Sequence, residues 1–281
     1  MHLYFENRFM APEQAGLSLQ DLSIQRGYGI FEFFRTRGNT PLFLEDHLER
    51  FFRSAELMHL HVPHSWEKIM AIIYELIHRN NLNESGIRIG LSGGILEEDT
   101  LIRDPVFFIM QSKLSMPSWE SYSKGVKVIT HPFTRELPLA KTINYATAVW
   151  MLPAMKKAGA ADILYHQGEN VSEFSRRNIF IVNDENEILT PTENILLGIT
   201  RKKVLELAKE KKYTVIEKNI TLYEVYRAKE VFMTSTIKRV MPVVAIDDKQ
   251  IGDGRPQKIT IDLLTAFMAM EQQLTGEPAN L

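Results

Sequence analysis

The chain has 281 residues, 44% hydrophobic and 24% charged, which is typical of a globular protein with a sizeable core and favours two domains. Its formal net charge of -2 argues against a broadly basic surface, so we predict no nucleic-acid partner. The absence of cysteine excludes disulfides, a thiolate nucleophile and a zinc–thiolate site.

The N-terminal sequence MHLYFENRFMAPEQ has no basic segment followed by an apolar run, as a signal peptide would have. The longest apolar runs, such as VFFIM at 106–110, are far too short to span a bilayer. We therefore expect a protein of the cytoplasm that does not associate with membranes.

The first 115 residues are predicted to form a smaller domain of mixed helix and sheet. The aromatic stretch 29–36, the turn residues RGNT and the stretch PLFL predict a hairpin. Residues 45–60 carry apolar side chains three and four positions apart, which predicts an amphipathic helix, and a second helix is expected over 65–81. The stretches GIRIGLSG and PVFFIMQSKL are then predicted strands.

Residues 116–125 are polar and rich in turn formers, so we predict a linker there and a larger domain over 126–281. In this second domain we expect a helix that ends near Ala158 and strands in ADILYHQ, NIFIVND and EILTPT. A helix from Thr200 to about Lys211, a strand in TVIEKNI, a short helix in LYEVYRA, strands in EVFMTST and MPVVAIDD, and a C-terminal helix complete the prediction. The fold class is therefore mixed α/β in two domains.

Lys141 lies in the mostly apolar segment PLAKTINYATAVW, where a surface lysine would not be expected. An amine that is held out of bulk water loses its proton more readily and becomes chemically useful. By itself, however, a lysine is most often a solvated surface group.

Three further features could bind a charged cofactor. Glu173 is predicted to lie in a short segment between two strands, where its carboxylate could pair with a protonated ring nitrogen, although it could also be a turn residue. Gly198 precedes Ile199 and Thr200 at a predicted helix start, which is either a phosphate site or an ordinary start capped by Thr200. Hydroxyls gather where a predicted strand ends, at Thr234, Ser235 and Thr236.

The order of these features resembles that of the class IV aminotransferases, the fold-type IV pyridoxal-phosphate enzymes. Arg50 comes first, then lysine in KTINY, the segment SEFSRRN, GITR before a helix, and TST at a strand end. The resemblance extends from about Asp21 to 254. It includes branched-chain aminotransferases, D-amino acid aminotransferases and aminodeoxychorismate lyases.

The resemblance implies a role for each of these residues. Lys141 would hold pyridoxal 5′-phosphate through a Schiff base and then move a proton between the substrate Cα and the cofactor's C4′. Glu173 would pair with the ring nitrogen, and Tyr145 would hydrogen-bond the phenolic oxygen. The residues that would hold the phosphate are Arg50, the backbone of Ile199 and Thr200, and the hydroxyls of Ser235 and Thr236.

Several positions depart from the family pattern. Phe31 stands where the D-amino acid enzymes have tyrosine, and Gly93 stands where they carry arginine, so we predict that D-amino acid specificity of that type is absent. Because Arg26 occupies a position that is aromatic in the family, we hypothesise that it faces the pocket and binds the substrate carboxylate, with a surface ion pair as the alternative. Adjacent residues on a strand point to opposite faces, so at most one of Arg176 and Arg177 could face inward.

Our leading prediction is an aminotransferase that acts on an amino acid, with a branched-chain L-amino acid favoured, and on a 2-oxo acid. A 4-amino-4-deoxychorismate lyase is the alternative, and a catalytically silent ligand-binding homologue is the third hypothesis. Phe31 is expected to line an apolar substrate pocket. The resemblance also implies a homodimer. His47 and His166 have no metal-ligand spacing, so we expect both to be structural or surface groups and we predict no metal.

Overall fold

A computed structural model describes residues 1–98 and 100–276 and divides the chain into two compact units. The first unit contains residues 1–115 together with 140–144, and the second contains 116–139 and 145–281. The break after residue 115 agrees with the prediction. Two features differ from it: the expected linker contains helix α4 (Trp119–Lys124), and the segment that carries Lys141 belongs to the first unit.

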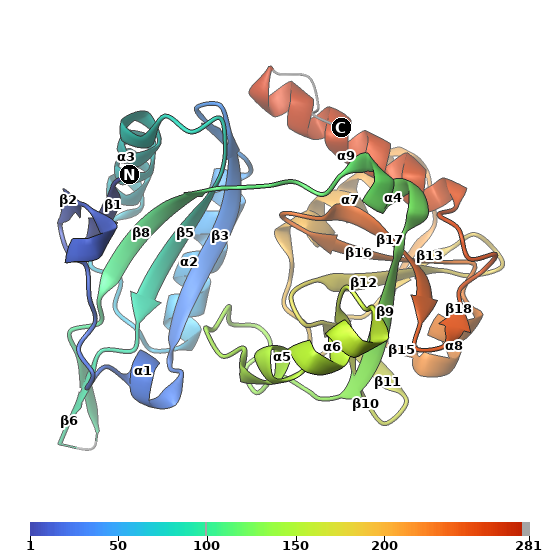
Figure 1. Cartoon of the computed structure of the whole chain (residues 1–281), viewed down its shortest axis with the longest axis horizontal. Coiled ribbons are helices and arrows are strands. Elements are labelled where there is room, and N and C mark those ends of the chain that lie inside the picture. Colours follow the sequence, from blue (N-terminus) through green and yellow to red (C-terminus); the bar gives the residue numbers. More distant parts are fainter. Residues whose placement is uncertain (99, 277–281) are drawn as a thin grey trace. The chain divides into compact units, whose positions relative to one another are not determined.

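An antiparallel sheet of six strands, in the order β2-β1-β8-β5-β3-β4, forms the centre of the first unit (Figure 1). Its long strands are β3 (Gly29–Arg37), β5 (Glu84–Ser92) and β8 (Phe107–Lys113). The other elements are short: β1 (Leu3–Phe5), β2 (Arg8–Met10), a 3-10 turn at Pro12–Gln14, α1 (Leu22–Arg26), β4 (Thr40–Pro41), and the separate hairpin of β6 (Ile95–Glu97) and β7 (Leu101–Arg103).

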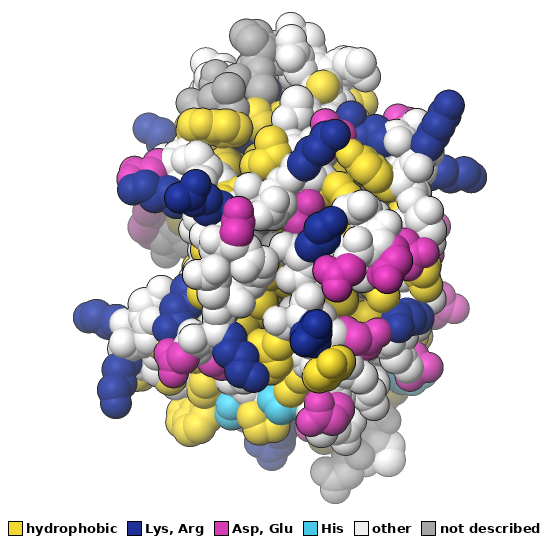
Figure 2. All heavy atoms as spheres, turned by 90° about the vertical axis from the view of Figure 1, so that its right-hand side faces the viewer, with side chains coloured by type: hydrophobic (Ala, Val, Ile, Leu, Met, Phe, Trp, Pro, Cys, Tyr) yellow, Lys and Arg dark blue, Asp and Glu magenta, His cyan; other side chains and the backbone are white. Residues whose placement is uncertain are grey.

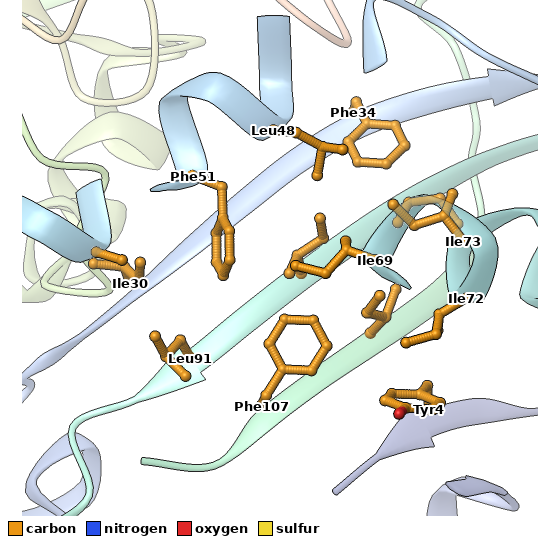
Figure 3. Close-up of a cluster of buried hydrophobic side chains, with 14 of the residues drawn as sticks. Tyr4, Ile30, Phe34, Leu48, Phe51, Ile69, Ile72, Ile73, Leu91 and Phe107 are labelled. Carbon is orange, nitrogen blue, oxygen red and sulfur yellow. The ribbon is translucent and has the colours of Figure 1, made fainter. Parts of the chain in front are cut away.

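Two amphipathic helices, α2 (Leu44–Leu57) and α3 (Trp66–Asn80), cover this sheet. Ser65 caps α3 by accepting a hydrogen bond from Lys68 N. The close-up in Figure 3 shows their apolar side chains directed at strand residues; the buried cluster includes Leu48, Phe51, Ile69 and Phe107. Burial of these side chains holds β3 and α2 together, and these two elements carry the residues discussed below.

A mixed sheet of ten strands forms the centre of the second unit (Figure 1). Its order is β14-β13-β12-β16-β17-β9-β10-β11-β15, with β18 paired to β17. The strands are β9 (Val126–Pro132), β10 (Ile163–Gln167), β11 (Asn170–Phe174), β12 (Asn178–Val182), β13 (Ile188–Thr190), β14 (Val215–Glu217), β15 (Ile220–Thr221), β16 (Glu230–Ser235), β17 (Arg239–Ile246) and β18 (Lys249–Gln250). Glu173 therefore lies in strand β11, so the prediction of a connecting segment there was wrong.

Helices α7 (Ile199–Glu210) and α9 (Lys258–Thr275) pack against each other and against β16 and β17. The buried ion pair between Arg239 Nε and Glu271 Oε2, at 2.9 Å, links β17 to α9. The single helix predicted to end near Ala158 is two short helices, α5 (Ala146–Trp150) and α6 (Leu152–Ala158). Helix α8 (Leu222–Arg227) begins with a capping box made by Thr221 and Glu224.

Candidate active site

Backbone hydrogen bonds to the first unit's sheet fix the position of Lys141. Its carbonyl accepts from Phe31 N at 3.0 Å, and Ile143 N donates to Gly29 O at 3.0 Å, so residues 141–143 run antiparallel to the start of β3. On the other side, Lys141 N donates to the buried hydroxyl of Ser54 on α2 at 3.1 Å. The lysine is therefore attached to both a strand and a helix, and it is only half-buried.

The side chain of Lys141 lies over an aromatic ring. Its Nζ is 4.7 Å from the centroid of the Phe31 ring, and the guanidinium carbon of Arg88 is 4.3 Å from the same centroid. Arg88 lies on β5, directly beside β3, and is exposed. The ring therefore makes cation–π contacts with both cations, and it restricts the positions open to the lysine amine.

A buried network lies on the face of α2 that contacts β3. Arg50 makes a bidentate ion pair with Glu32: Nε donates to Oε2 at 2.9 Å and Nη2 donates to Oε1 at 2.7 Å. His47 Nδ1 is 2.9 Å from the same Oε1. Because an ionised carboxylate can only accept, His47 Nδ1 must carry a proton.

The pKa values of this network follow from burial and charge. Burial by itself would raise the pKa of Glu32, but the nearby Arg50 and His47, which also donate hydrogen bonds to it, hold that pKa well below its usual range. Burial lowers the pKa of His47; Glu32 opposes this effect, and the charges of Arg50 and Lys141 add to it. Glu32 is therefore ionised and His47 neutral at neutral pH. The sequence analysis missed both roles, although positions 47, 50 and 54 share one helical face.

In the second unit, the carboxylate of Glu173 is almost fully buried and held by three donors. Leu196 N donates to Oε2 at 3.0 Å, Asn178 Nδ2 reaches the same oxygen at 3.5 Å, and Arg135 Nη1 donates to Oε1 at 3.0 Å. Arg135 lies in the loop after β9, and no sequence motif had indicated it. These bonds fix the direction of the carboxylate.

Two tyrosines belong to the same part of this unit. Burial raises the pKa of Tyr165 to about 12, with further contributions from Glu173 and Tyr145. Tyr165 is therefore a neutral hydroxyl close to the Glu173 carboxylate. Tyr145 is half-buried, precedes α5 and also raises the pKa of Tyr165; its role toward the cofactor stays a prediction.

The N-terminus of α7 begins at Ile199, with Gly198 rather than Thr200 in the capping position. No side chain caps it, so the first backbone N–H groups of this 12-residue helix are not satisfied by a cap. A Cβ at position 198 would lie 2.1 Å from Asn178 Oδ1, whose amide Nδ2 donates to Leu196 O. Only glycine fits where the chain passes this closely to Asn178.

The β16–β17 hairpin carries the remaining predicted residues. Ser235 Oγ accepts from Lys238 N at 3.1 Å and closes the turn that contains Thr236. Thr234 pairs with Asn178 across β16 and β12, and its buried hydroxyl has no hydrogen-bond partner within the described chain. This hydroxyl is a further candidate contact for a bound group, and the sequence analysis had not assigned it a role.

The arginines that depart from the family pattern lie in different environments. Arg26 is exposed at the end of α1 and donates to the neighbouring Gln25 O at 3.0 Å; its predicted carboxylate-binding role stays a prediction. Arg177 faces inward and pairs with buried Asp162, whereas Arg176 is exposed, in agreement with the expectation that at most one faces inward. Within the described ranges, no group of three or more His, Asp or Glu side chains could hold a metal ion.

A family model decides the classification. The model of the family described as "Amino-transferase class IV" matches residues 29–246, which is more than three quarters of the chain and includes every residue of both clusters. The chain belongs to the class IV aminotransferase family. It is therefore an enzyme of the transaminase class, as the sequence analysis predicted.

Known relatives include both D-alanine and branched-chain aminotransferases. This aminotransferase is 28% identical to the D-alanine aminotransferase of Listeria monocytogenes serotype 4b (strain F2365), over 99% of this chain and 98% of that protein. It is 30% identical to a Methanocaldococcus jannaschii protein provisionally named a branched-chain-amino-acid aminotransferase, over 95% of each.

Solved structures have the same fold. The branched-chain amino acid aminotransferase of T.th., solved with pyridoxamine 5′-phosphate, superposes with a TM-score of 0.89 at 27% identity and covers 98% of this chain and 94% of that one. Another structure of that protein holds N-(5′-phosphopyridoxyl)-L-glutamate, with a TM-score of 0.87. The predicted mixed α/β, fold-type IV architecture is thereby confirmed.

Proposed function

We propose that this aminotransferase uses pyridoxal 5′-phosphate, held by Lys141, to move an amino group between an L-amino acid and a 2-oxo acid. The observation that carries the proposal is that the backbone of Lys141 is hydrogen-bonded to β3 on one side and to α2 on the other. Such attachment fixes the backbone from which the lysine side chain extends, so the amine of a covalent cofactor link starts from a defined position. The structures of the T.th. enzyme support the same cofactor chemistry.

The residues present fit this cofactor. Glu173 is a buried carboxylate held in one direction by Leu196 N and Arg135, which suits a partner for a protonated ring nitrogen. The uncapped start of α7, with a glycine that leaves no room for a Cβ, suits a phosphate group approached by backbone N–H groups. The hydroxyl of Thr234 adds a buried polar atom that a bound group could satisfy.

Each proposed role uses the chemistry of the side chain. Bound pyridoxal phosphate supplies an electron sink for the substrate's α-carbon. Lys141 removes the Cα proton and returns it at C4′, and Glu173 keeps the ring nitrogen protonated. Tyr145 donates to the phenolic oxygen. The phosphate is held by Arg50, the backbone of Ile199 and Thr200, and the hydroxyls of Ser235 and Thr236.

The substrate proposal favours L-amino acids with branched-chain side chains. A Cβ at position 93 would lie 2.3 Å from Tyr28 O and 2.8 Å from Leu22 Cβ, so this position cannot carry the arginine that D-amino acid enzymes of that type have there. Phe31 provides an apolar ring 4.7 Å from the lysine amine, which suits an aliphatic side chain. Arg26 stays a candidate for the substrate carboxylate.

A homodimer completes the proposal. Val149, Trp150 and Leu152 on α5 and α6 are 60%, 71% and 46% exposed, and Leu137 and Leu139 of the preceding loop are also exposed. A group of large apolar side chains of this kind is typical of a protein interface. On the face shown in Figure 2, lysine and arginine side chains are interspersed with aspartate and glutamate, which suits the absence of a nucleic-acid partner.

Within the described ranges, no helix meets the length and hydropathy of a membrane span. The cytoplasmic location stays a prediction, as does a role in amino-acid metabolism.

Absorbance spectroscopy with single substrates tests the function. Addition of L-leucine or L-glutamate to the purified enzyme with its cofactor should remove the visible band, and the matching 2-oxo acid should restore it. D-Alanine should leave the band unchanged. A response to D-alanine alone would overturn the substrate proposal. A band that no amino acid alters, with pyruvate released from 4-amino-4-deoxychorismate, would instead identify the lyase.

A further inference from the structure

The Glu32–His47–Arg50 network suggests how the phosphate-binding arginine is held. We propose that Glu32 is a positioning residue that fixes the guanidinium of Arg50 for the cofactor phosphate, and that His47 fixes the Glu32 carboxylate. This inference rests on the proposed function, in which Arg50 binds that phosphate.

The geometry of the ion pair restricts the arginine. Glu32 receives hydrogen bonds from Nε and Nη2, which together form one edge of the planar guanidinium. A bidentate contact along one edge sets the plane of the group and the direction of the remaining nitrogen, Nη1. A single contact would leave the group free to rotate about the bond, so the second bond supplies the orientation.

The carboxylate is itself held by further donors. Glu32 Oε1 accepts from Phe33 N at 2.8 Å and from His47 Nδ1 at 2.9 Å, in addition to Arg50. Glu32 is 0% exposed and the side chain of Arg50 is 10% exposed, so water competes little for these bonds. The carboxylate has donors from its own strand and from two positions on α2, and these donors leave it one orientation.

A neutral histidine suits this role better than a charged one. Protonated His47 would place a third cation beside Arg50 and Lys141, whose charges already lower its pKa. A neutral ring donates through Nδ1 without adding charge, so the negative charge of Glu32 stays matched by the positive charge of Arg50. The same arrangement, in which one side chain orients another that holds the ligand, is common around metal ligands.

A purely structural ion pair between β3 and α2 is the competing explanation, and the phosphate itself distinguishes the two. Pyridoxal forms the same covalent link as pyridoxal phosphate but has no phosphate. A residue that acts through Arg50 should therefore affect the affinity for pyridoxal phosphate and not that for pyridoxal. A residue that only stabilises the unit should affect both equally.

The experiment measures the dissociation constants of both compounds by absorbance titration of the apoenzyme. Glu32→Gln should weaken pyridoxal phosphate binding by roughly 10- to 100-fold, the range seen when a group that orients a ligand-binding side chain is removed, and should leave pyridoxal binding unchanged. Glu49→Gln, which removes an exposed charge one residue before Arg50, is the matched control and should change neither. In an Arg50→Met background, Glu32→Gln should have no further effect.

Equal weakening for both compounds, or effects of Glu32→Gln and Arg50→Met that add, would overturn the inference. Glu32→Asp keeps the charge and withdraws the carboxylate by one methylene, and it allows the same comparison if the Gln variant does not fold. Borohydride reduction followed by peptide mapping separates this result from the proposed function. If the cofactor is attached to Lys141 and Arg50→Met weakens pyridoxal phosphate binding but Glu32→Gln does not, only the present inference fails.

Discussion

The protonation of His47 makes the stability of the folded protein depend on pH. The folded state holds its pKa below the ordinary value of 6.5, so below that pH the unfolded chain binds a proton that the folded chain does not. The stability that neutral His47 contributes is therefore complete above about pH 6.5 and is lost as the pH falls through the folded-state pKa. Glu32, whose pKa is also lowered, loses its contribution only below its unfolded value of 4.5.

The predicted consequence is an acid-sensitive free energy of unfolding. Below pH 6.5 the wild-type protein should lose at most about 1.4 kcal/mol per pH unit through His47 until the folded-state pKa is reached. His47→Asn, which keeps an amide donor for Glu32, should remove this part of the slope. Urea denaturation at several pH values measures it. The same slope in wild type and His47→Asn, with His61→Asn as the exposed control, would contradict the account.

At the scale of elements, the start of α7 depends on Gly198. A Cβ 2.1 Å from Asn178 Oδ1 would displace an amide that binds Leu196 O and reaches Glu173. Gly198→Ala should therefore weaken pyridoxal phosphate binding about tenfold or more, because both the phosphate site and the ring-nitrogen partner lose their support. Gly16→Ala, where the new Cβ has nothing within 4 Å, should leave the affinity unchanged. Unaltered binding in both variants would contradict the assignment of α7.

The elements also show what the sequence could predict. Helices α2 and α3 follow from their apolar periodicity, and the order of motifs indicated Lys141, Glu173 and Thr200. The sequence did not reveal that Glu173 lies in a strand, because β11 buries polar residues on both faces and shows no alternation. It also could not indicate that residues 140–144 join β3, since that pairing depends on hydrogen bonds to residues more than 100 positions away.

At the scale of the whole molecule, the proposed homodimer gives a further prediction. If the apolar side chains on α5 and α6 form the interface, Trp150→Glu should convert a dimer into a monomer, because burial of a carboxylate in an apolar contact is unfavourable. Light scattering coupled to gel filtration measures the mass. Tyr74→Glu, at a position on α3 that is 46% exposed, is the control and should remain dimeric. A monomeric wild-type protein would contradict the proposal directly.

The central claim is that Lys141 holds the cofactor, and one measurement tests it most directly. The purified protein is loaded with pyridoxal phosphate, reduced with borohydride, digested, and analysed by mass spectrometry for the modified lysine. We predict that the phosphopyridoxyl group is found on Lys141, and that Lys141→Ala protein carries none at any position. Modification of a different lysine in the wild-type protein, or no modification at all, would contradict the account.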